Sequence, residues 1–229
     1  MYKHLFFDLD RTLWDFDTNS REVLHELSLK YKLQELGVTS TDTFITEYIA
    51  INELLWAEYR LDLIDKESLR FDRFHRTLQL YGINDRKLTE AIGNDYTSIG
   101  PQRKHLFPDA KEVLGYLSEK YVLHIITNGF EETQHIKMEC SGLKPFFAEI
   151  ITSERAGCKK PDKRIFDYSV GAAKTDFASS LMIGDCLEAD IGGARNAGIH
   201  QVYFNPSGFA HAETPTYEIK NLKELLNFL

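Results

Sequence analysis

Short apolar runs that end in small or acidic residues occur at the start of the chain and recur through its second half. The first run covers His4–Phe7, and later runs cover residues 121–127, 148–152, 180–183 and 200–204. Each run has the length of a strand and holds few charged residues, which is typical of strands that are buried on both faces. The pattern therefore predicts strands of a parallel sheet.

Helical periodicity separates these runs. Amphipathic segments are expected at 108–120, 131–141, 162–173 and 188–197, and a last helix is expected at 222–229. Strands that alternate with helices are the signature of crossover connections. We therefore predict an α/β fold with a Rossmann-like, doubly wound parallel sheet.

Residues 16–100 have a different pattern, with helical spacing and no strong strand signal. Apolar positions such as Val23, Leu24 and Leu27 lie at helical spacing, and further helices are expected at 41–60, 65–81 and 85–98. This segment is predicted to be an inserted α-helical cap domain. The catalytic core would then be discontinuous, formed by residues 1–15 and 101–229.

Composition narrows the classes of protein. The 229 residues are 43% apolar and 27% charged, with 27 Lys and Arg against 35 Asp and Glu, giving a net charge of −8. An acidic chain argues against general binding to nucleic acid. Three cysteines without Cys-x-x-Cys spacing argue against structural zinc and suit a reducing compartment, so a cytoplasmic location without membrane segments is expected.

Polar residues follow the predicted strands at the point where each strand ends. Asp8 and Asp10 follow the first strand, and Thr127, Asn128 and Gly129 follow the second. The carboxyl ends of parallel strands meet at one edge of a sheet, where ligands bind in open α/β folds. An isolated Asp-x-Asp-x-Thr sequence also occurs where Asp merely begins a turn, so partners elsewhere decide the interpretation.

Three further residues supply such partners. Lys160 precedes a predicted helix, and Asp185 and Asp190 follow the strand at 180–183. Phosphoryl transfer needs a nucleophile, charge neutralisation and proton transfer. Asp8 can act as the nucleophile, and Asp8, Asp185 and the Asp10 carbonyl can bind Mg²⁺, with Asp190 orienting metal-bound water. Lys160 adds positive charge, keeping Asp8 ionised.

The segment Thr127-Asn128-Gly129 is predicted to bind the transferring phosphate. The Thr127 hydroxyl and the N–H groups of Asn128 and Gly129 precede a helix, where backbone donors point outward. Together with Lys160, these groups would neutralise charge on the phosphoryl oxygens.

These residues, in this order, resemble the four motifs of the haloacid dehalogenase superfamily of phosphohydrolases. Asp8-Leu9-Asp10-Arg11-Thr12 resembles the first motif, Thr127-Asn128-Gly129 the second, Lys160-Pro161 the third, and Gly184-Asp185 with Asp190 the fourth. The resemblance implies that Asp10 is the general acid and base. Carbon–halogen hydrolases of the superfamily usually lack this second acid, so Asp10 favours a phosphatase. Arg11 and Cys186 depart from the commoner residues at their positions.

The sequence from Phe7 to Phe16 and the cap length look like the pyrimidine 5′-nucleotidase branch of that superfamily. Trp14 can pack against a base, or it can be a core or hinge residue. Arg70 and Arg73 lie one helical turn apart in the cap and either face a substrate or are solvated and paired with acids. His124, inside a predicted strand, is interpreted as a core residue.

The leading hypothesis is a Mg²⁺-dependent phosphomonoesterase that acts on a small phosphorylated metabolite, favouring pyrimidine nucleoside monophosphates, as a monomer or weak homodimer. A small-sugar-phosphate phosphatase or phosphomutase would use the same core. A phospho-accepting receiver module also clusters acids, a Thr and a Lys at strand ends. It would, however, lack both the inserted cap and the acid two residues after the acceptor.

Overall fold

The computed structural model describes residues 1–229, which form two compact units. One unit combines Met1–Phe16 with Lys104–Leu229, and the other is Asp17–Arg103. The boundaries expected from the sequence fall after residues 15 and 100. The roles of the two units as catalytic core and cap stay predictions.

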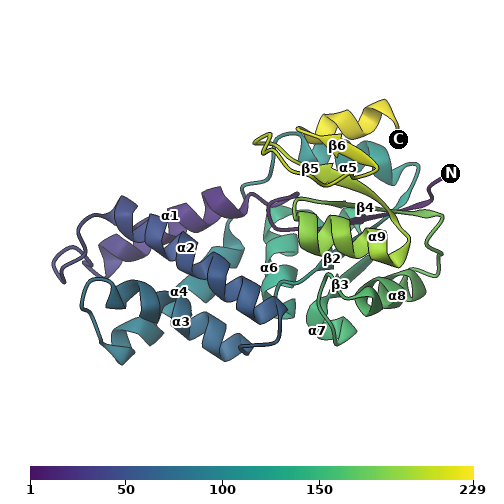
Figure 1. The fold of residues 1–229 in the computed structure, drawn as a ribbon. Coiled ribbons are helices and arrows are strands. Elements are labelled where there is room, and N and C mark those ends of the chain that lie inside the picture. Colours follow the sequence, from purple (N-terminus) through teal and green to yellow (C-terminus); the bar gives the residue numbers. More distant parts are fainter. The chain divides into compact units, whose positions relative to one another are not determined.

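A six-stranded parallel sheet forms the centre of the first unit (Figure 1). The strand order is β3-β2-β1-β4-β5-β6, so the chain starts in the middle and winds outward in both directions. The strands are β1 (His4–Phe7), β2 (Val122–Thr127), β3 (Glu149–Thr152), β4 (Ser180–Gly184), β5 (His200–Phe204) and β6 (Tyr217–Ile219). This arrangement is the predicted doubly wound α/β fold.

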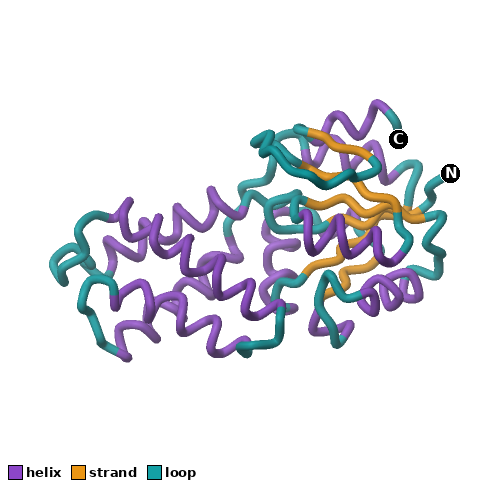
Figure 2. Tube along the Cα trace, viewed as in Figure 1, coloured by secondary structure: helices purple, strands orange, loops and turns teal.

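Helices cover both faces of this sheet, as the trace in Figure 2 shows. Alternate residues of β1 point to opposite faces: Leu5 and Phe7 belong to one buried cluster and Phe6 to another. The first cluster includes residues of α5 (Ala110–Ser118), α6 (Glu131–Ser141) and the 3₁₀ segment η4 (Leu222–Asn227). The second includes residues of α8 (Lys163–Ala172) and α9 (Gly193–Ala197). Burial on both faces explains why apolar residues predominate in the central strands.

The second unit is helical. Its elements are α1 (Phe16–Lys30), α2 (Thr41–Arg60), α3 (Lys66–Gln79) and α4 (Arg86–Ile99), with the 3₁₀ segment η1 (Gly100–Gln102). The side chains of Ser40, Asp65 and Asp85 accept hydrogen bonds from the first turns of α2, α3 and α4. The core combines Val23, Leu24 and Leu27 with aromatic residues from the other helices. The helical periodicity therefore correctly predicted four helices here.

Several elements differ from the predictions. Residues 188–197 were expected to form one helix, but they begin within a π-helical segment, η3 (Leu187–Gly192), before α9. The Cys186 carbonyl accepts hydrogen bonds from the N–H groups of both Asp190 and Ile191, which widens this turn. Strand β6, the short helix α7 (Ser153–Ala156) and the 3₁₀ segment η2 (Lys144–Phe146) were not predicted.

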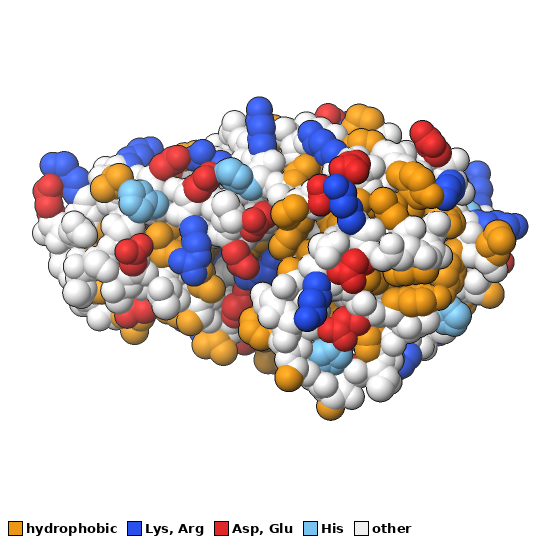
Figure 3. All heavy atoms as spheres, turned by 90° about the horizontal axis from the view of Figure 1, so that it is seen from above, with side chains coloured by type: hydrophobic (Ala, Val, Ile, Leu, Met, Phe, Trp, Pro, Cys, Tyr) orange, Lys and Arg blue, Asp and Glu red, His pale blue; other side chains and the backbone are white.

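The surface carries charges of both signs. On the face shown in Figure 3, Lys and Arg side chains are interspersed with Asp and Glu side chains. None of the helices is both long enough and apolar enough to span a bilayer.

Candidate active site

The carboxyl ends of three adjacent strands bring the predicted residues together. Asp8 directly follows β1, and its N–H donates to the Ile183 carbonyl of β4 at 2.9 Å. Thr127 is the last residue of β2, and Asp185 directly follows β4. Parallel pairing of β1 with both neighbours aligns these three ends, so their side chains share one edge of the sheet.

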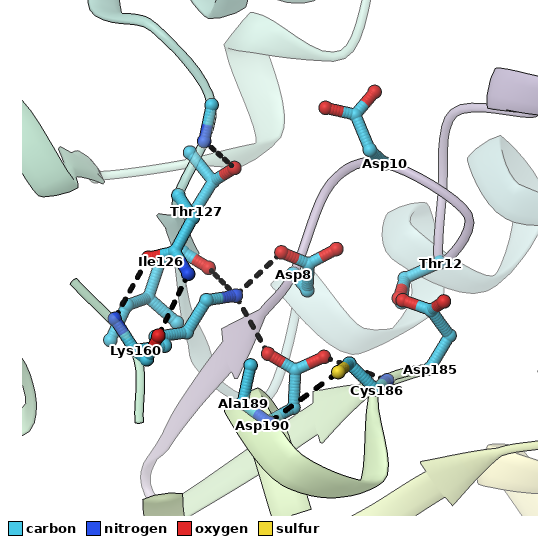
Figure 4. Close-up of polar contacts among 12 residues, drawn as sticks. Asp8, Asp10, Thr12, Ile126, Thr127, Lys160, Asp185, Cys186, Ala189 and Asp190 are labelled. Atoms are coloured by element: carbon cyan, nitrogen blue, oxygen red, sulfur yellow. Dashed lines mark hydrogen bonds and ion pairs between the residues drawn. The ribbon is translucent and has the colours of Figure 1, made fainter. Parts of the chain in front are cut away.

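Lys160 lies between two carboxylates at this edge (Figure 4). Its Nζ is 2.6 Å from Asp8 Oδ1 and 2.7 Å from Asp190 Oδ1, and it donates to the Ile126 carbonyl at 2.8 Å. The lysine side chain is only 2% exposed and Asp190 1%. A buried ammonium is stable only with partners, and Lys160 has hydrogen bonds to Asp8 and to the Ile126 carbonyl together with the ion pair to Asp190.

Backbone contacts fix the position of Lys160. Asn128 Oδ1 accepts the Lys160 N–H at 2.8 Å, and Asn128 Nδ2 donates to the Lys160 carbonyl at 2.9 Å. Asn128 was predicted to contribute its N–H to a phosphate site. Its side chain also links the end of β2 to the backbone of Lys160. The peptide bond between Lys160 and Pro161 is cis.

The excess of negative charge shifts several pKa values. Burial raises the pKa of Asp8 to about 7, with Asp190 adding to this effect and Lys160 opposing it. Burial, with the charges of Asp8 and Asp190, raises the pKa of Asp185 well above its ordinary value. Burial disfavours the Lys160 cation, but its two carboxylate neighbours outweigh this and raise its pKa. One cation does not neutralise three acids, so the pKa values of Asp8 and Asp185 are raised.

The donor set fits a hard divalent cation. Carboxylate oxygens of Asp8, Asp185 and Asp190 all lie within 4.8 Å of one another. Asp190 is already held by Lys160, and its Oδ2 accepts the Cys186 N–H at 3.0 Å. Asp185 Oδ1 accepts a hydrogen bond from the Thr12 hydroxyl at 3.3 Å. Carboxylate oxygens are the ligands that Mg²⁺ prefers, so Asp8 and Asp185 are the pair best placed to hold it.

Asp190 approaches the sheet closely because no side chain stands in its way. A Cβ atom at Gly184 would lie 2.3 Å from Asp190 Oδ2. The glycine of the Gly184-Asp185 pair is therefore required sterically. The role predicted for Asp190, orienting metal-bound water, stays a prediction, while its contacts place it beside Lys160.

Comparison with known proteins agrees with this geometry. The model of the haloacid dehalogenase-like hydrolase family matches residues 2–198. The chain belongs to this family. It is 34% identical to the pyrimidine 5′-nucleotidase PynA of Streptococcus pneumoniae, over 100% of this chain and 95% of that protein. It is 33% identical to the pyrimidine 5′-nucleotidase YjjG of Escherichia coli, over 98% and 96% of the two chains.

A solved structure supports the same fold. The magnesium-bound crystal structure of the HAD-hydrolase YfnB from Bacillus subtilis superimposes with a TM-score of 0.88 at 30% identity. The match covers 99% of this chain and 97% of that one. The similarity therefore extends over both units of this hydrolase.

Asp10 of this hydrolase does not join the cluster around Lys160, and Figure 4 shows its carboxylate turned away from Asp8. Lys137 Nζ lies 2.5 Å from Asp10 Oδ1, and Gln134 Nε2 donates to Asp10 Oδ2 at 2.9 Å. Sequence reasoning missed both α6 residues. Their spacing of three, which the sequence shows, places them on one helix face, but their burial is known only from the fold.

Thr127 is held by the same helix. Its Oγ1 accepts the Gly129 N–H at 3.1 Å and the Gln134 Nε2–H at 2.8 Å. A Cβ atom at Gly129 would lie 2.1 Å from Gln134 Nε2, so this position requires glycine. The Thr127-Asn128-Gly129 segment therefore depends on Gln134 for its shape.

Two side chains left open by the sequence are now placed. Trp14 is 2% exposed and belongs to the core cluster of its unit, with its ring 4.3 Å from Lys137 Nζ. Arg73 was expected to face substrate or to be solvated or paired with acids. It is instead buried in the helical unit, its guanidinium 4.7 Å from the Tyr96 ring centroid. His124 is buried, as predicted, and contacts His4 at 3.0 Å.

Proposed function

We propose that this hydrolase is a Mg²⁺-dependent phosphomonoesterase that forms an aspartyl phosphate on Asp8. The observation that carries the proposal is the meeting of Asp8, Lys160 and Asp185 at one sheet edge beside the Thr127 hydroxyl. Mg²⁺ held by Asp8 and Asp185 would supply charge neutralisation for the phosphoryl oxygens. The Thr127 hydroxyl and the Asn128 N–H would bind the remaining oxygens. Lys160 would add its positive charge beside Asp8, while the Gly129 N–H is used by Thr127 Oγ1.

In the proposed mechanism, Asp8 and Asp10 act in both of two half-reactions. An Asp8 oxygen attacks phosphorus, the ester P–O bond breaks, and Asp10 donates its proton to the leaving alkoxide. In the second half-reaction Asp10 takes a proton from water, the water oxygen bonds to phosphorus, and the Asp8–phosphorus bond breaks. Phosphate leaves and both side chains return to their initial states.

The names of two relatives support a proposal for the substrate class. The two bacterial proteins that match nearly the whole chain at 33–34% identity are named pyrimidine 5′-nucleotidases. We therefore propose a pyrimidine nucleoside 5′-monophosphate as the preferred ester. We expect the enzyme to be cytoplasmic and to run as a monomer or weak homodimer in sedimentation analysis.

A panel of phosphate esters tests this proposal. Uridine, cytidine and adenosine 5′-monophosphates are compared with small sugar phosphates in the presence of Mg²⁺. Pyrimidine nucleotides should give the highest kcat/KM. If sugar phosphates exceed every nucleotide by a large factor, the nucleotidase assignment is wrong while the phosphatase assignment stands.

Two variants test the mechanism. Asp8→Asn should abolish turnover, because an amide cannot form the acyl phosphate; near-normal turnover by this variant would contradict the covalent scheme. Asp185→Ala should shift the Mg²⁺ titration to higher concentration. An unchanged titration would remove Asp185 from the metal ligands.

A further inference from the structure

Two side chains of α6 fix the Asp10 carboxylate from both sides. Lys137 Nζ lies 2.5 Å from Oδ1, and Gln134 Nε2 donates to Oδ2 at 2.9 Å. The Lys137 side chain is only 7% exposed, and Gln134 is fully buried. Both oxygens of Asp10 therefore have a charged or polar donor from a rigid element rather than from a loop.

The amide orientation of Gln134 is determined by its partners. Turning the amide over would point Oε1, which cannot donate, at the Asp10 carboxylate. With Nε2 inward, one N–H donates to Asp10 and the other to Thr127 Oγ1 at 2.8 Å. Gln134 thus connects the proposed proton-transfer group to the proposed phosphate-binding group.

This connection also determines what Thr127 can do. Its hydroxyl oxygen accepts hydrogen bonds from Gln134 and from the Gly129 N–H, so both lone pairs are in use. Its own hydrogen is then left to donate, and a phosphoryl oxygen is a suitable acceptor.

Two aromatic rings pack against the Lys137 ammonium group. Lys137 Nζ is 4.3 Å from the centroid of the Trp14 ring and 5.7 Å from that of Phe16. Both aromatic residues lie just after Asp10 in sequence, so the segment that carries Asp10 also packs against the lysine. Cation–π contact and the ion pair together leave Lys137 little freedom.

We propose that Lys137 and Gln134 are positioning residues that hold Asp10 beside the leaving-group oxygen. The inference rests on the proposed role of Asp10 as general acid and base. Lys137 fixes one carboxylate oxygen, and Gln134 sets the distance between that carboxylate and the Thr127 hydroxyl that binds the phosphate. Neither residue contacts the reacting atoms, and each acts through its neighbour.

Leaving-group dependence tests the proposal. Uridine 5′-monophosphate leaves as an alkoxide that needs a proton, whereas p-nitrophenyl phosphate leaves as a stable phenolate. Because kcat/KM reports the first half-reaction, a misplaced acid should slow the nucleotide far more than the aryl ester. Lys137→Met should lower kcat/KM for the nucleotide about 10- to 100-fold more than for p-nitrophenyl phosphate.

Matched variants complete the experiment. Lys144→Met makes the same change at an exposed lysine paired with Glu139 and should leave both esters unaffected. Gln134→Met should also lower kcat/KM more for the nucleotide than for the aryl ester. If Lys137→Met does not fold, as shown by the lack of a cooperative thermal transition, Gln134→Met replaces it in the experiment. Asp10→Asn removes the proposed acid itself and therefore gives the largest expected contrast, which is the difference between the losses in kcat/KM for the two esters.

The outcomes separate the inference from the function on which it rests. Equal losses on both esters, or no loss, in Lys137→Met and Gln134→Met would overturn the positioning role while Asp10→Asn still shows the contrast. Absence of the contrast in Asp10→Asn, or no hydrolysis of either ester by the unaltered enzyme, would overturn both the proposed mechanism and the inference.

Discussion

The charge excess at the site makes metal-free stability depend on pH, and Asp8→Asn isolates the part due to Asp8. The pKa of this carboxyl is raised from 3.8 to about 7, mainly by burial. The folded state therefore keeps a proton on Asp8 over a pH range in which the unfolded state has lost it. Folding stability should fall as pH rises through this range, since the unfolded state binds fewer protons.

The two pKa values give the magnitude. Linkage between a pKa of 3.8 and one of about 7 costs the folded state about 2 kcal/mol at pH 5 and about 4 kcal/mol at pH 8. The stability of the metal-free enzyme should thus fall by about 2–3 kcal/mol over this interval because of Asp8. Asp8→Asn carries no such titration. The variant should gain about that much relative to the unaltered enzyme between pH 5 and pH 8.

Urea unfolding in EDTA at pH 5, 6, 7 and 8 measures this difference. Subtracting the unaltered enzyme from the variant cancels the histidines and the acids remote from the site. Asp185 loses the Asp8 charge that helps to raise its pKa, and this adds to the difference in the same direction. Asp167→Asn, an exposed carboxylate paired with Lys163, is the matched control and should show a constant difference. A difference for Asp8→Asn that stays constant or shrinks as pH rises would refute the reasoning.

The same experiment with Mg²⁺ extends the argument. Because Mg²⁺ binds ionised carboxylates, it should stabilise the unaltered enzyme more at pH 8 than at pH 5. Asp8→Asn should gain much less from the metal. Equal stabilisation of both proteins by Mg²⁺ would show that Asp8 is not a ligand.

Three further changes test the fold around the site. Burial lowers the pKa of His124 to about 4, so the free energy of unfolding should fall by up to about 3 kcal/mol as pH falls from 6.5 to 4. In urea titrations, His124→Gln should lose this dependence of stability on pH. An unchanged dependence would contradict the prediction. Gly129→Ala should cost about 1–3 kcal/mol by colliding with Gln134, whereas Gly171→Ala, with open space, should not destabilise. Lys174→Gly should raise the free energy of unfolding by about 1 kcal/mol, and with it the urea midpoint, since Lys174 has a φ of 52°; a lower midpoint would exclude strain there.

The sheet could be predicted because its strands are buried on both faces. In Val122–Thr127 every residue after Val122 is buried, so apolar composition marks the run, and its polar ending marks the edge where ligands bind. Strand β6 was missed because Tyr217–Ile219 is only three residues long and lies at the edge of the sheet. Such a segment has too few residues to show a period.

Residues 188–197 were predicted as one regular helix, but tertiary contacts of Asp190 accompany a π-helical first turn. Asp190 contacts two partners at the same time. One is Lys160, which is distant in sequence, and the other is the backbone N–H of Cys186. The wider π-helical turn accommodates both contacts. Periodicity contains no information on such a tertiary demand.

Lys137 and Gln134 were missed because polar residues on an amphipathic helix are normally assigned to its solvated face. Their partners, Asp10 and Thr127, are separated from them in sequence by 127 and 7 residues. Only the fold shows that this face of α6 covers the strand ends.

Charge balance connects the two halves of the site. Three carboxylates, Asp8, Asp185 and Asp190, surround the single ammonium of Lys160, which leaves two negative charges when all are ionised. A divalent cation would neutralise this excess. Asp10, by contrast, has its own cation in Lys137. The carboxylate of the proposed proton-transfer group thus has a cationic partner of its own, separate from the ammonium that the acids of the proposed metal site share.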